Sequence, residues 1–409
     1  MWDLLFNSRK ILSRNRYPWI DYARGICIIL VCYRHIFGGV MTEHYSPTDH
    51  PVLSYINIFF FSFRMPLFFI VSGMFYKLSQ ENKGTSNFVR NRAQTILYPL
   101  LLWGTIHITL QLLFADYVNV VRQPADYLKL LYEPRSIEQF WYLNALFFVG
   151  VSYALISKYA SFNTGKQLVL GIVLYGVAGY LHMQGIDAGF ITDVFFFYFF
   201  FAIGDAVSGF MLDKKQFKNI ASWKTLLLIL PVFILLQHYF TKLNFDSSDD
   251  YYVQNTQPVL FAVAALVGGS FIICCSFLLQ KSGKLKFLRV VGYHSMYIYV
   301  TNLIITSGTR TLMIRVFGID NMYLVLLVGT IAGIVLPIMF YNIMTRAGAW
   351  WLFTLQKPRA IAMREEKKTI FRGLTEPEHK HVQEAIEQEK LKQPSWMSQV
   401  KTGRPYLKK

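Results

Sequence analysis

Long apolar runs, separated by short polar connections, occupy the chain to about residue 345. A helix needs about 20 mostly apolar residues to cross the ~30 Å hydrocarbon layer of a membrane. Runs of about that length lie at residues 19–40, 52–76, 94–114, 139–157, 167–183, 190–211, 223–240, 258–279, 288–306 and 322–344. They are continuous rather than alternating, which favours helices over the strands of a membrane barrel. The pattern therefore predicts an all-α fold, a polytopic membrane bundle of about ten transmembrane helices.

The end of the chain has a different character. From residue 358 to residue 409 the sequence is polar and basic. Thr375 and Glu378 are spaced as in a helix-capping box, so a charged helix through about Lys392 fits this stretch. We therefore predict a transmembrane domain at residues 1–357 and a short soluble tail at 358–409, partly helical. A cytoplasmic extension attracted to anionic lipid is the simplest role for such a tail.

The composition narrows the class of protein. Of 409 residues, 54% are hydrophobic and only 16% are charged, yet the formal net charge is +17. Apolar content this high excludes a disordered chain, and soluble enzymes carry nearer to about 25% charged residues. The four cysteines all lie in apolar runs, which excludes a disulfide scaffold. These figures fit a multi-pass membrane protein whose positive charge is confined to one side.

The lysines and arginines are distributed unevenly about the predicted spans. Eighteen lie in the N-terminal arm and the even-numbered connections, against six in the odd-numbered connections, and thirteen more follow Arg346. Positive charge accumulates on the cytoplasmic side of membrane proteins. We therefore predict a protein of the cell (inner) membrane with both termini in the cytoplasm. The charge sets the topology, and no nucleic-acid partner is needed to explain it.

A few charged or titratable side chains fall inside the predicted spans. In the first span Asp21, Arg24 and His35 share one helix face, because the eleven steps from Arg24 to His35 return to within about 20° and rise about 16 Å. In the second span Arg64 falls near the bilayer centre, and Pro66 predicts a kink or an unwound turn beside it. A charge in the bilayer costs at least about 2.5–3.5 kcal/mol, so these residues must face protein or a wet cavity.

Other polar residues near the spans have less specific patterns. Arg34 points away from the polar face and is expected to reach the outer surface or a salt-bridge partner. Glu138, close to Trp141 at the outer end of the fourth span, could orient an acceptor hydroxyl or a histidine. His107 is predicted to be a hydrogen-bonded core residue. Residues 43–50 have the composition of a metal site but irregular spacing, so we predict no metal.

Several motifs, in order over residues 17–345, resemble the membrane acyltransferase-3 family. The motifs are Asp21-x-x-Arg24-Gly25 ending in His35, Ser62-Phe-Arg64-Met-Pro66-Leu-Phe-Phe-x-x-Ser72-Gly73, the basic segment Phe88-Val-Arg90-Asn-Arg92 leading to Tyr98-Pro99, Phe140-Trp141-Tyr142-Leu143, and Gly292-Tyr-His-Ser295-Met-Tyr297. The first two motifs are the most specific. The likeness covers nearly all of the predicted transmembrane domain.

This resemblance implies an integral-membrane O-acyltransferase. Such an enzyme takes an acyl group, often acetyl, from acyl-CoA and passes it to a hydroxyl of a saccharide, a glycolipid or a similar envelope component. The resemblance implies no bound cofactor, with acyl-CoA, most simply acetyl-CoA, as the co-substrate. Mapped onto this sequence, it gives functional positions to Arg24, His35 and Arg64, and a basic segment to Arg90 and Arg92.

Acyl transfer to a hydroxyl needs a base for the hydroxyl proton and a group that stabilises the oxyanion. A neutral histidine near pH 7 is the natural base. We therefore predict His35, Arg24 and Arg64 as the catalytic residues. The predicted substrate-binding residues are Asp21, Arg90, Arg92, Glu138 and Trp141. In this hypothesis acyl-CoA binds from the cytoplasm at Arg90 and Arg92, and the acceptor reaches His35 from outside; direct attack and an acyl-histidine intermediate both stay open.

Two other classes of protein compete with the enzyme. A transporter or flippase for an anionic or saccharide substrate would use the same arginine and histidine stripe as a substrate or proton path. The sequence has no evident inverted repeat of the kind many transporters show. A non-catalytic scaffold explains charged residues within two adjacent spans poorly. Binding or hydrolysis of acyl-CoA by the purified protein separates the enzyme from the transporter.

Overall fold

The structure is a computed structural model that describes residues 5–13, 17–43, 50–115, 120–319 and 321–356. The predicted tail at 358–409 lies outside the described residues. The helices are α2 (Ser8–Leu12), α3 (Pro18–Glu43), α4 (Pro51–Phe59), α5 (Arg64–Met74), α6 (Tyr76–Arg92), α7 (Tyr98–Leu113), α8 (Asp126–Tyr132), α9 (Trp141–Tyr159), α10 (Thr164–Met183), α11 (Phe190–Met211), α12 (Phe217–Ile220), α13 (Trp223–Asp246), α14 (Tyr252–Thr256), α15 (Pro258–Ser282), α16 (Phe287–Tyr293), α17 (Ser295–Thr311) and α18 (Met322–Arg346). Shorter turns are the π-helical η1 (Ala93–Leu97) and η5 (Leu312–Val316) and the 3-10 helices η3 (Pro134–Phe140), η4 (Lys214–Gln216) and η6 (Trp350–Leu352).

The described part of the chain is helical and contains no strand. Nine helical stretches within it are long and apolar enough to cross a membrane, and they match nine of the ten predicted runs. The remaining run, 288–306, forms α16 and α17, which are separated at His294. The prediction of an all-α, multi-pass membrane protein is confirmed.

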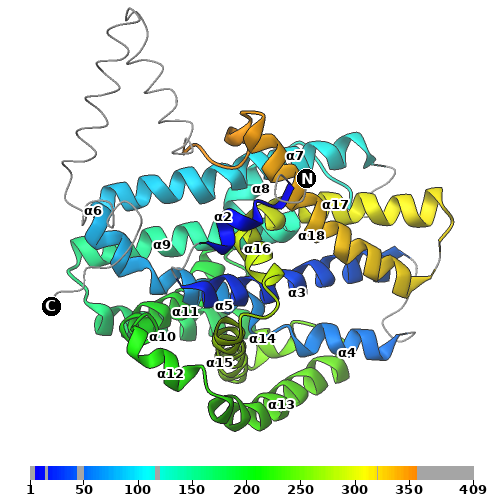
Figure 1. Cartoon of the computed structure of the whole chain (residues 1–409). Helices are drawn as coiled ribbons and strands as arrows, with labels where there is room; N and C mark the ends of the chain where they lie inside the picture. Colours follow the sequence, from blue (N-terminus) through cyan, green and yellow to red (C-terminus); the bar gives the residue numbers. More distant parts are fainter. Residues whose placement is uncertain (1–4, 14–16, 44–49, 116–119, 320, 357–409) are drawn as a thin grey trace, which may run out of the picture. The chain divides into compact units, whose positions relative to one another are not determined.

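Helix α3 occupies the centre of the bundle and packs against α5, α15, α16, α17 and α18 (Figure 1). Its contact with α16 depends on two glycines. A Cβ added to Gly25 would lie 2.2 Å from the carbonyl oxygen of Leu288, and one added to Gly292 would lie 1.8 Å from that of Asp21. Small residues let membrane helices approach backbone to backbone, which is how these helices gain packing contacts without a hydrophobic drive between them. The glycines of two motifs thereby fix the position of α3.

The second predicted span is broken inside the bundle. Helix α4 ends at Phe59 and α5 begins at Arg64, so residues 60–63 form a turn between two half-helices. Pro66 has no N–H to donate, and its ring disfavours a continuous helix through the preceding turn. The predicted interruption beside Arg64 is confirmed, and it places the guanidinium at the start of a half-helix within the membrane span.

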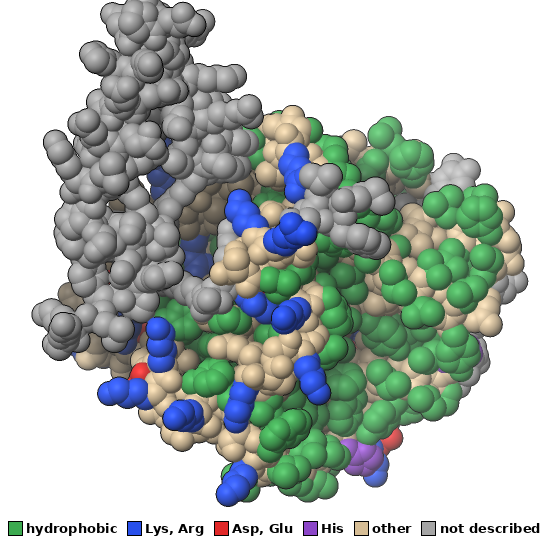
Figure 2. All heavy atoms as spheres, viewed as in Figure 1, with side chains coloured by type: hydrophobic (Ala, Val, Ile, Leu, Met, Phe, Trp, Pro, Cys, Tyr) green, Lys and Arg blue, Asp and Glu red, His purple; other side chains and the backbone are tan. Residues whose placement is uncertain are grey.

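Charge is segregated on the surface. Figure 2 shows lysine and arginine side chains gathered on the left of the face in view, while the right of that face is mostly hydrophobic. The exposed lysines include Lys77, Lys158, Lys215, Lys224 and Lys281, which all belong to the N-terminal arm or the even-numbered connections of the sequence. This separation agrees with the uneven distribution of charge in the sequence.

Candidate active site

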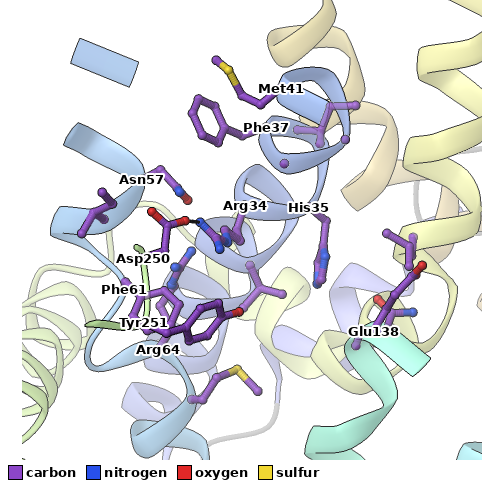
Figure 3. Close-up of a pocket in the computed structure, with 18 of the residues that line it drawn as sticks. Arg34, His35, Phe37, Met41, Asn57, Phe61, Arg64, Glu138, Asp250 and Tyr251 are labelled. Carbon is purple, nitrogen blue, oxygen red and sulfur yellow. Dashed lines mark hydrogen bonds and ion pairs between the residues drawn. The ribbon is translucent and has the colours of Figure 1, made fainter. Parts of the chain in front are cut away.

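A cavity of about 850 Å³ opens among α3, the turn between α4 and α5, α7, η3 and α17 (Figure 3). Four of the eight predicted site residues line it: His35, Arg64, Glu138 and Trp141. Residues from distant parts of the sequence meet here, so the cavity is a product of helix packing. Its size is within the range of small-molecule sites in proteins.

His35 presents a half-buried imidazole to the cavity. Figure 3 shows the side chains of Arg34 and His35 leaving α3 in different directions, Arg34 toward Asp250 and His35 on the side of Glu138. Within the described residues, neither ring nitrogen of His35 has a hydrogen-bond partner. Both nitrogens are therefore free to exchange a proton with a bound molecule.

Arg64 lines the same cavity from the first position of α5. Its side chain is almost fully buried, with the residue only 3% exposed, and Nη1 donates to the carbonyl oxygen of Leu30 at 2.9 Å. The guanidinium also lies 5.2 Å from the centre of the Phe61 ring. No carboxylate of the described residues pairs with it. A guanidinium has five N–H donors, so most of the donors of Arg64 are available to a ligand.

Glu138 is held on the opposite wall by three side chains. Its Oε2 accepts from His107 Nε2 at 3.1 Å, and its Oε1 accepts from Gln111 Nε2 at 3.1 Å and Arg122 Nη2 at 3.3 Å. The backbone of Glu138 has φ 52° and ψ −121°, in a region that favours glycine. Such strain costs about 1–3 kcal/mol and persists where the surrounding contacts over-determine it, often at functional sites.

His107 contacts Glu138 in a way that the sequence pattern did not predict. We predicted that Glu138 could orient a histidine, and that His107 was a core residue; the structure joins the two across 31 positions. His107 and Gln111 are both buried, line the cavity and lie four residues apart on α7. A polar pair at i, i+4 in an apolar span is a signal that the sequence did offer, because such residues share one helix face.

Trp141 is fixed by aromatic and cationic neighbours. The Arg135 guanidinium carbon lies 4.5 Å from the centre of the Trp141 ring, and the Phe197 ring centre lies 5.3 Å away. Arg135 is itself held by Asp193, with Nε and Nη2 donating to Oδ1 at 2.9 Å and 2.6 Å. The indole therefore forms a rigid part of the wall.

Two buried amides line the cavity without a protein partner. Asn57 is 1% exposed and Gln139 is 2% exposed, and within the described residues neither the side-chain nitrogen nor the side-chain oxygen of either residue has a hydrogen-bond partner. An unsatisfied buried polar group costs about 1–3 kcal/mol. A cavity that tolerates four such atoms suits a ligand rich in hydroxyl or amide groups.

The other four predicted site residues lie away from the cavity. Asp21 and Arg24 are half-buried nearer the start of α3, and Arg90 is exposed near the end of α6. Arg92 is buried, where Nη2 donates to Ser72 Oγ at 2.9 Å and Nη1 donates to the carbonyl oxygen of Leu146 at 3.1 Å. The structure therefore separates the two arginines of the basic segment, one at the surface and one packed inside.

Arg34 has the salt-bridge partner that the sequence left open. It forms an ion pair with Asp250, which lies between α13 and α14.

His294 separates α16 from α17 and is fully buried, with Nδ1 donating to the carbonyl oxygen of Val290 at 2.7 Å and Nε2 accepting from Asn342 at 3.1 Å. Within the described residues no group of three or more metal-ligating side chains comes together, and the loop 43–50 lies largely outside them.

The family model for an acyltransferase domain matches residues 17–342, which is most of the chain. This chain belongs to the membrane acyltransferase-3 family. The match spans every residue that lines the cavity, so the cavity lies within the family's domain.

Two curated relatives resemble part of this acyltransferase-family chain. Nodulation protein NolL of Sinorhizobium fredii is 29% identical over 159 residues, which are 39% of this chain and 40% of that protein. Nodulation protein NolL of Mesorhizobium japonicum is 30% identical over 151 residues, which are 37% of this chain and 38% of that protein. The matches thus span about two fifths of the length of these relatives. No solved structure matches the chain.

Proposed function

We propose that this protein is an integral-membrane O-acyltransferase that moves an acyl group, most simply acetyl, from acyl-CoA to a hydroxyl of a saccharide or other cell-envelope component. Membership of the acyltransferase-3 family supports the reaction class. The observation that carries the site assignment is the cavity itself. It is lined by the imidazole of His35, which has no hydrogen-bond partner among the described residues, and by the buried guanidinium of Arg64, which donates to a backbone carbonyl.

In this reaction His35 takes the proton of the acceptor hydroxyl as its oxygen attacks the thioester carbonyl. The negative charge that develops on the carbonyl oxygen is stabilised by N–H donors of Arg64, which are already oriented and shielded from bulk water. When the intermediate collapses, the C–S bond breaks and the imidazolium of His35 returns the proton to the departing CoA thiolate. A positioned acid–base group contributes about 10²–10⁴ in rate.

Glu138 and Trp141 act on the acceptor. Glu138 has a half-buried carboxylate, fixed by His107, Gln111 and Arg122, and its remaining acceptor capacity faces the cavity. It positions an acceptor hydroxyl relative to His35. Trp141 offers a rigid aromatic wall, and the amides of Asn57 and Gln139 supply hydrogen bonds to further hydroxyls.

Acyl-CoA enters from the cytoplasmic side, where the termini and most of the surface lysines lie in our topology. Arg90 is exposed there and attracts the donor's phosphates. Asp21 and Arg24, on the path from that side toward His35, contact the donor's arm. Arg92 is packed between Phe88 and Phe201, at 4.7 Å and 5.4 Å from their ring centres, so we assign it to the bundle and not to the donor phosphates.

A transporter is the second candidate, because a broken span with a charge at the break is also the design of many transporter sites. The deciding experiment is release of free CoA from acetyl-CoA by the detergent-purified full chain, with membrane glycan extracts as acceptor. The enzyme releases CoA, and the extract gains ester-linked acetyl groups seen by mass spectrometry. A transporter produces neither, and that result would overturn the proposal.

A further inference from the structure

The wall of the cavity around Arg34 carries an excess of positive charge. The guanidinium carbons of Arg34 and Arg64 lie 5.6 Å and 5.2 Å from the centre of the same ring, that of Phe61. Figure 3 shows both side chains on the same side of the cavity, with Asp250 and Tyr251 beside them. Asp250 pairs with Arg34, and no described carboxylate pairs with Arg64. Among the described residues these two neighbouring cations therefore have one carboxylate between them, and it pairs with Arg34.

A buried charge without a counter-charge is expensive, by several kcal/mol for a fully desolvated ion. Arg64 is 3% exposed, and its one hydrogen bond to the described residues is to a backbone carbonyl. A transient oxyanion does not offset this cost in the resting protein. An anionic group on a ligand would offset it from the moment the ligand binds, before the chemistry begins.

The carboxylate of Asp250 shows where an anionic group of a ligand could bind. The Asp250 side chain is 35% exposed and comes from the short connection between α13 and α14. Its carboxylate forms the ion pair with the Arg34 guanidinium, and both residues line the cavity. Arginine binds carboxylates and phosphates with the same planar fork. A ligand carboxylate or phosphate can therefore replace the Asp250 carboxylate on Arg34 without a change in the geometry of the guanidinium.

The remainder of this wall suits a sugar ring. Phe61 and Tyr251 contribute aromatic rings to the lining, and Asn57 contributes an amide with no protein partner among the described residues. Apolar faces with a few convergent polar groups are the usual lining of a small-molecule site.

We propose that the acceptor is an acidic saccharide, whose carboxylate or phosphate binds Arg34 in place of Asp250 and lies close enough to Arg64 to offset its charge. The proposal names the acceptor class and so rests on the acyl-transfer function proposed above. Asp250 is then a specificity-determining residue, because it competes for Arg34 and must be displaced by an anion that binds more strongly than it does.

The test is equilibrium dialysis of the detergent-purified full chain with radiolabelled glucuronate, glucose 1-phosphate and glucose, without any acyl donor. We expect at least one of the two acids to bind about tenfold more tightly than glucose, as close charge pairs predict. Asp250→Asn should tighten binding of that acid several-fold by removing the competitor. Asp246→Asn is the matched control, because it removes an exposed carboxylate from the end of α13 that does not line the cavity, and it should change nothing.

Arg34→Gln should abolish the preference for the acid, and Arg34→Lys should retain part of it, because lysine keeps the charge without the fork. If Asp250→Asn weakens acid binding as much as Arg34→Gln does, the ion pair is structural and the proposal is overturned. Equal binding of all three sugars overturns it as well. If unlabelled CoA displaces the acid and Arg34→Gln weakens CoA binding equally, the anion site belongs to the donor, which also overturns it.

His35→Ala keeps the two proposals apart. It should retain the preference for the acid over glucose, because that preference depends on Arg34, whose ion-pair partner is Asp250 and not His35. Failure of the acyl-transfer proposal would appear in CoA release, and failure of the acidic-acceptor proposal would appear in the dialysis.

Discussion

Arg64 and Arg92 are both buried arginines in the membrane bundle, and they differ in what surrounds them. Arg92 is 7% exposed, donates to a serine hydroxyl and a backbone carbonyl, and lies between two phenylalanine rings away from the cavity. Arg64 is 3% exposed, donates to one carbonyl, and lines a cavity of about 850 Å³. The Arg92 guanidinium joins two helices by hydrogen bonds, whereas the Arg64 guanidinium lines a cavity and makes one hydrogen bond to the described residues.

The comparison teaches that burial of a charge in a membrane protein does not by itself mark function. Both residues are arginines, both are almost fully buried, and both belong to motifs that resemble the family. What distinguishes them is how many donors the protein itself uses and whether a cavity lies beside the rest. By that criterion the cavity wall is the candidate site, because His35, Asn57 and Gln139 have side-chain atoms there without partners among the described residues and Arg64 lies beside them.

The largest expected effect is at His35. His35→Ala should lower the rate of acyl transfer by about 10²–10⁴, since it removes the proposed base, while the thermal midpoint changes little. The measurement is acetyl transfer in reconstituted vesicles. His238→Ala is the control, because His238 is exposed, lies outside the cavity lining and, among the described residues, forms its hydrogen bond with the Tyr55 hydroxyl. Near-normal turnover by His35→Ala would remove the base from the mechanism.

Arg64→Gln should slow transfer by about 10²–10³, the usual cost of losing an oxyanion donor. Its effect on stability should have the opposite sign to that of an ordinary core mutation. Removal of an uncompensated buried charge leaves the thermal midpoint unchanged or raises it. The vesicle assay and a thermal melt of the same preparation test both parts. If the variant is slow and also strongly destabilised, Arg64 is a structural residue like Arg92.

Glu138→Gln should lower transfer roughly tenfold, below the range for a group that itself moves the proton. The amide keeps the shape but loses the charge that faces His107 and Arg122, so the acceptor hydroxyl is positioned less well. We expect a rise in the KM for the acceptor. Loss of turnover as large as that of His35→Ala would instead indicate that Glu138 takes part in proton transfer.

Substitutions of Arg90 and Arg92 should have the smallest effects, and the two effects should differ in kind: one on substrate binding and the other on stability. Arg92→Gln should reduce the free energy of unfolding by about 1–3 kcal/mol, because Ser72 and the Leu146 carbonyl lose a donor, while turnover per folded molecule stays within about twofold. Arg90→Gln should leave the thermal midpoint unchanged and raise the KM for acetyl-CoA several-fold. Thermal melts and initial rates separate them. Identical behaviour of the two variants would contradict the assignment of Arg90 to donor binding and of Arg92 to the stability of the bundle.

Local features of the sequence were enough to predict most of the fold. Apolar runs of sufficient length predicted the spans, Pro66 predicted the break beside Arg64, and the polar face of α3 predicted that His35 turns away from lipid. The exception is the run that forms α16 and α17. It divides at His294 because the buried imidazole bonds to Val290 and Asn342, a tertiary environment that periodicity does not contain.

The site was predictable only in part, because its contacts join residues far apart in the chain. Arg34 and Asp250 are 216 positions apart, and no local pattern selects one carboxylate from several for such a pair. The burial of Arg92 depends on α9 and α11 lying over the start of η1, so spacing alone left it equivalent to Arg90. Helix propensity and hydrophobic period describe single elements, whereas the cavity is made by their packing.

The most direct test of the account is an experimental structure of the full chain in lipid nanodiscs with a ketone analogue of acetyl-CoA, in which a methylene replaces the thioester sulfur. We expect the acyl carbonyl to lie inside the cavity, within hydrogen-bond reach of Arg64 and beside the ring of His35. An acyl group bound outside this cavity, with His35 and Arg64 untouched, would contradict the central claim.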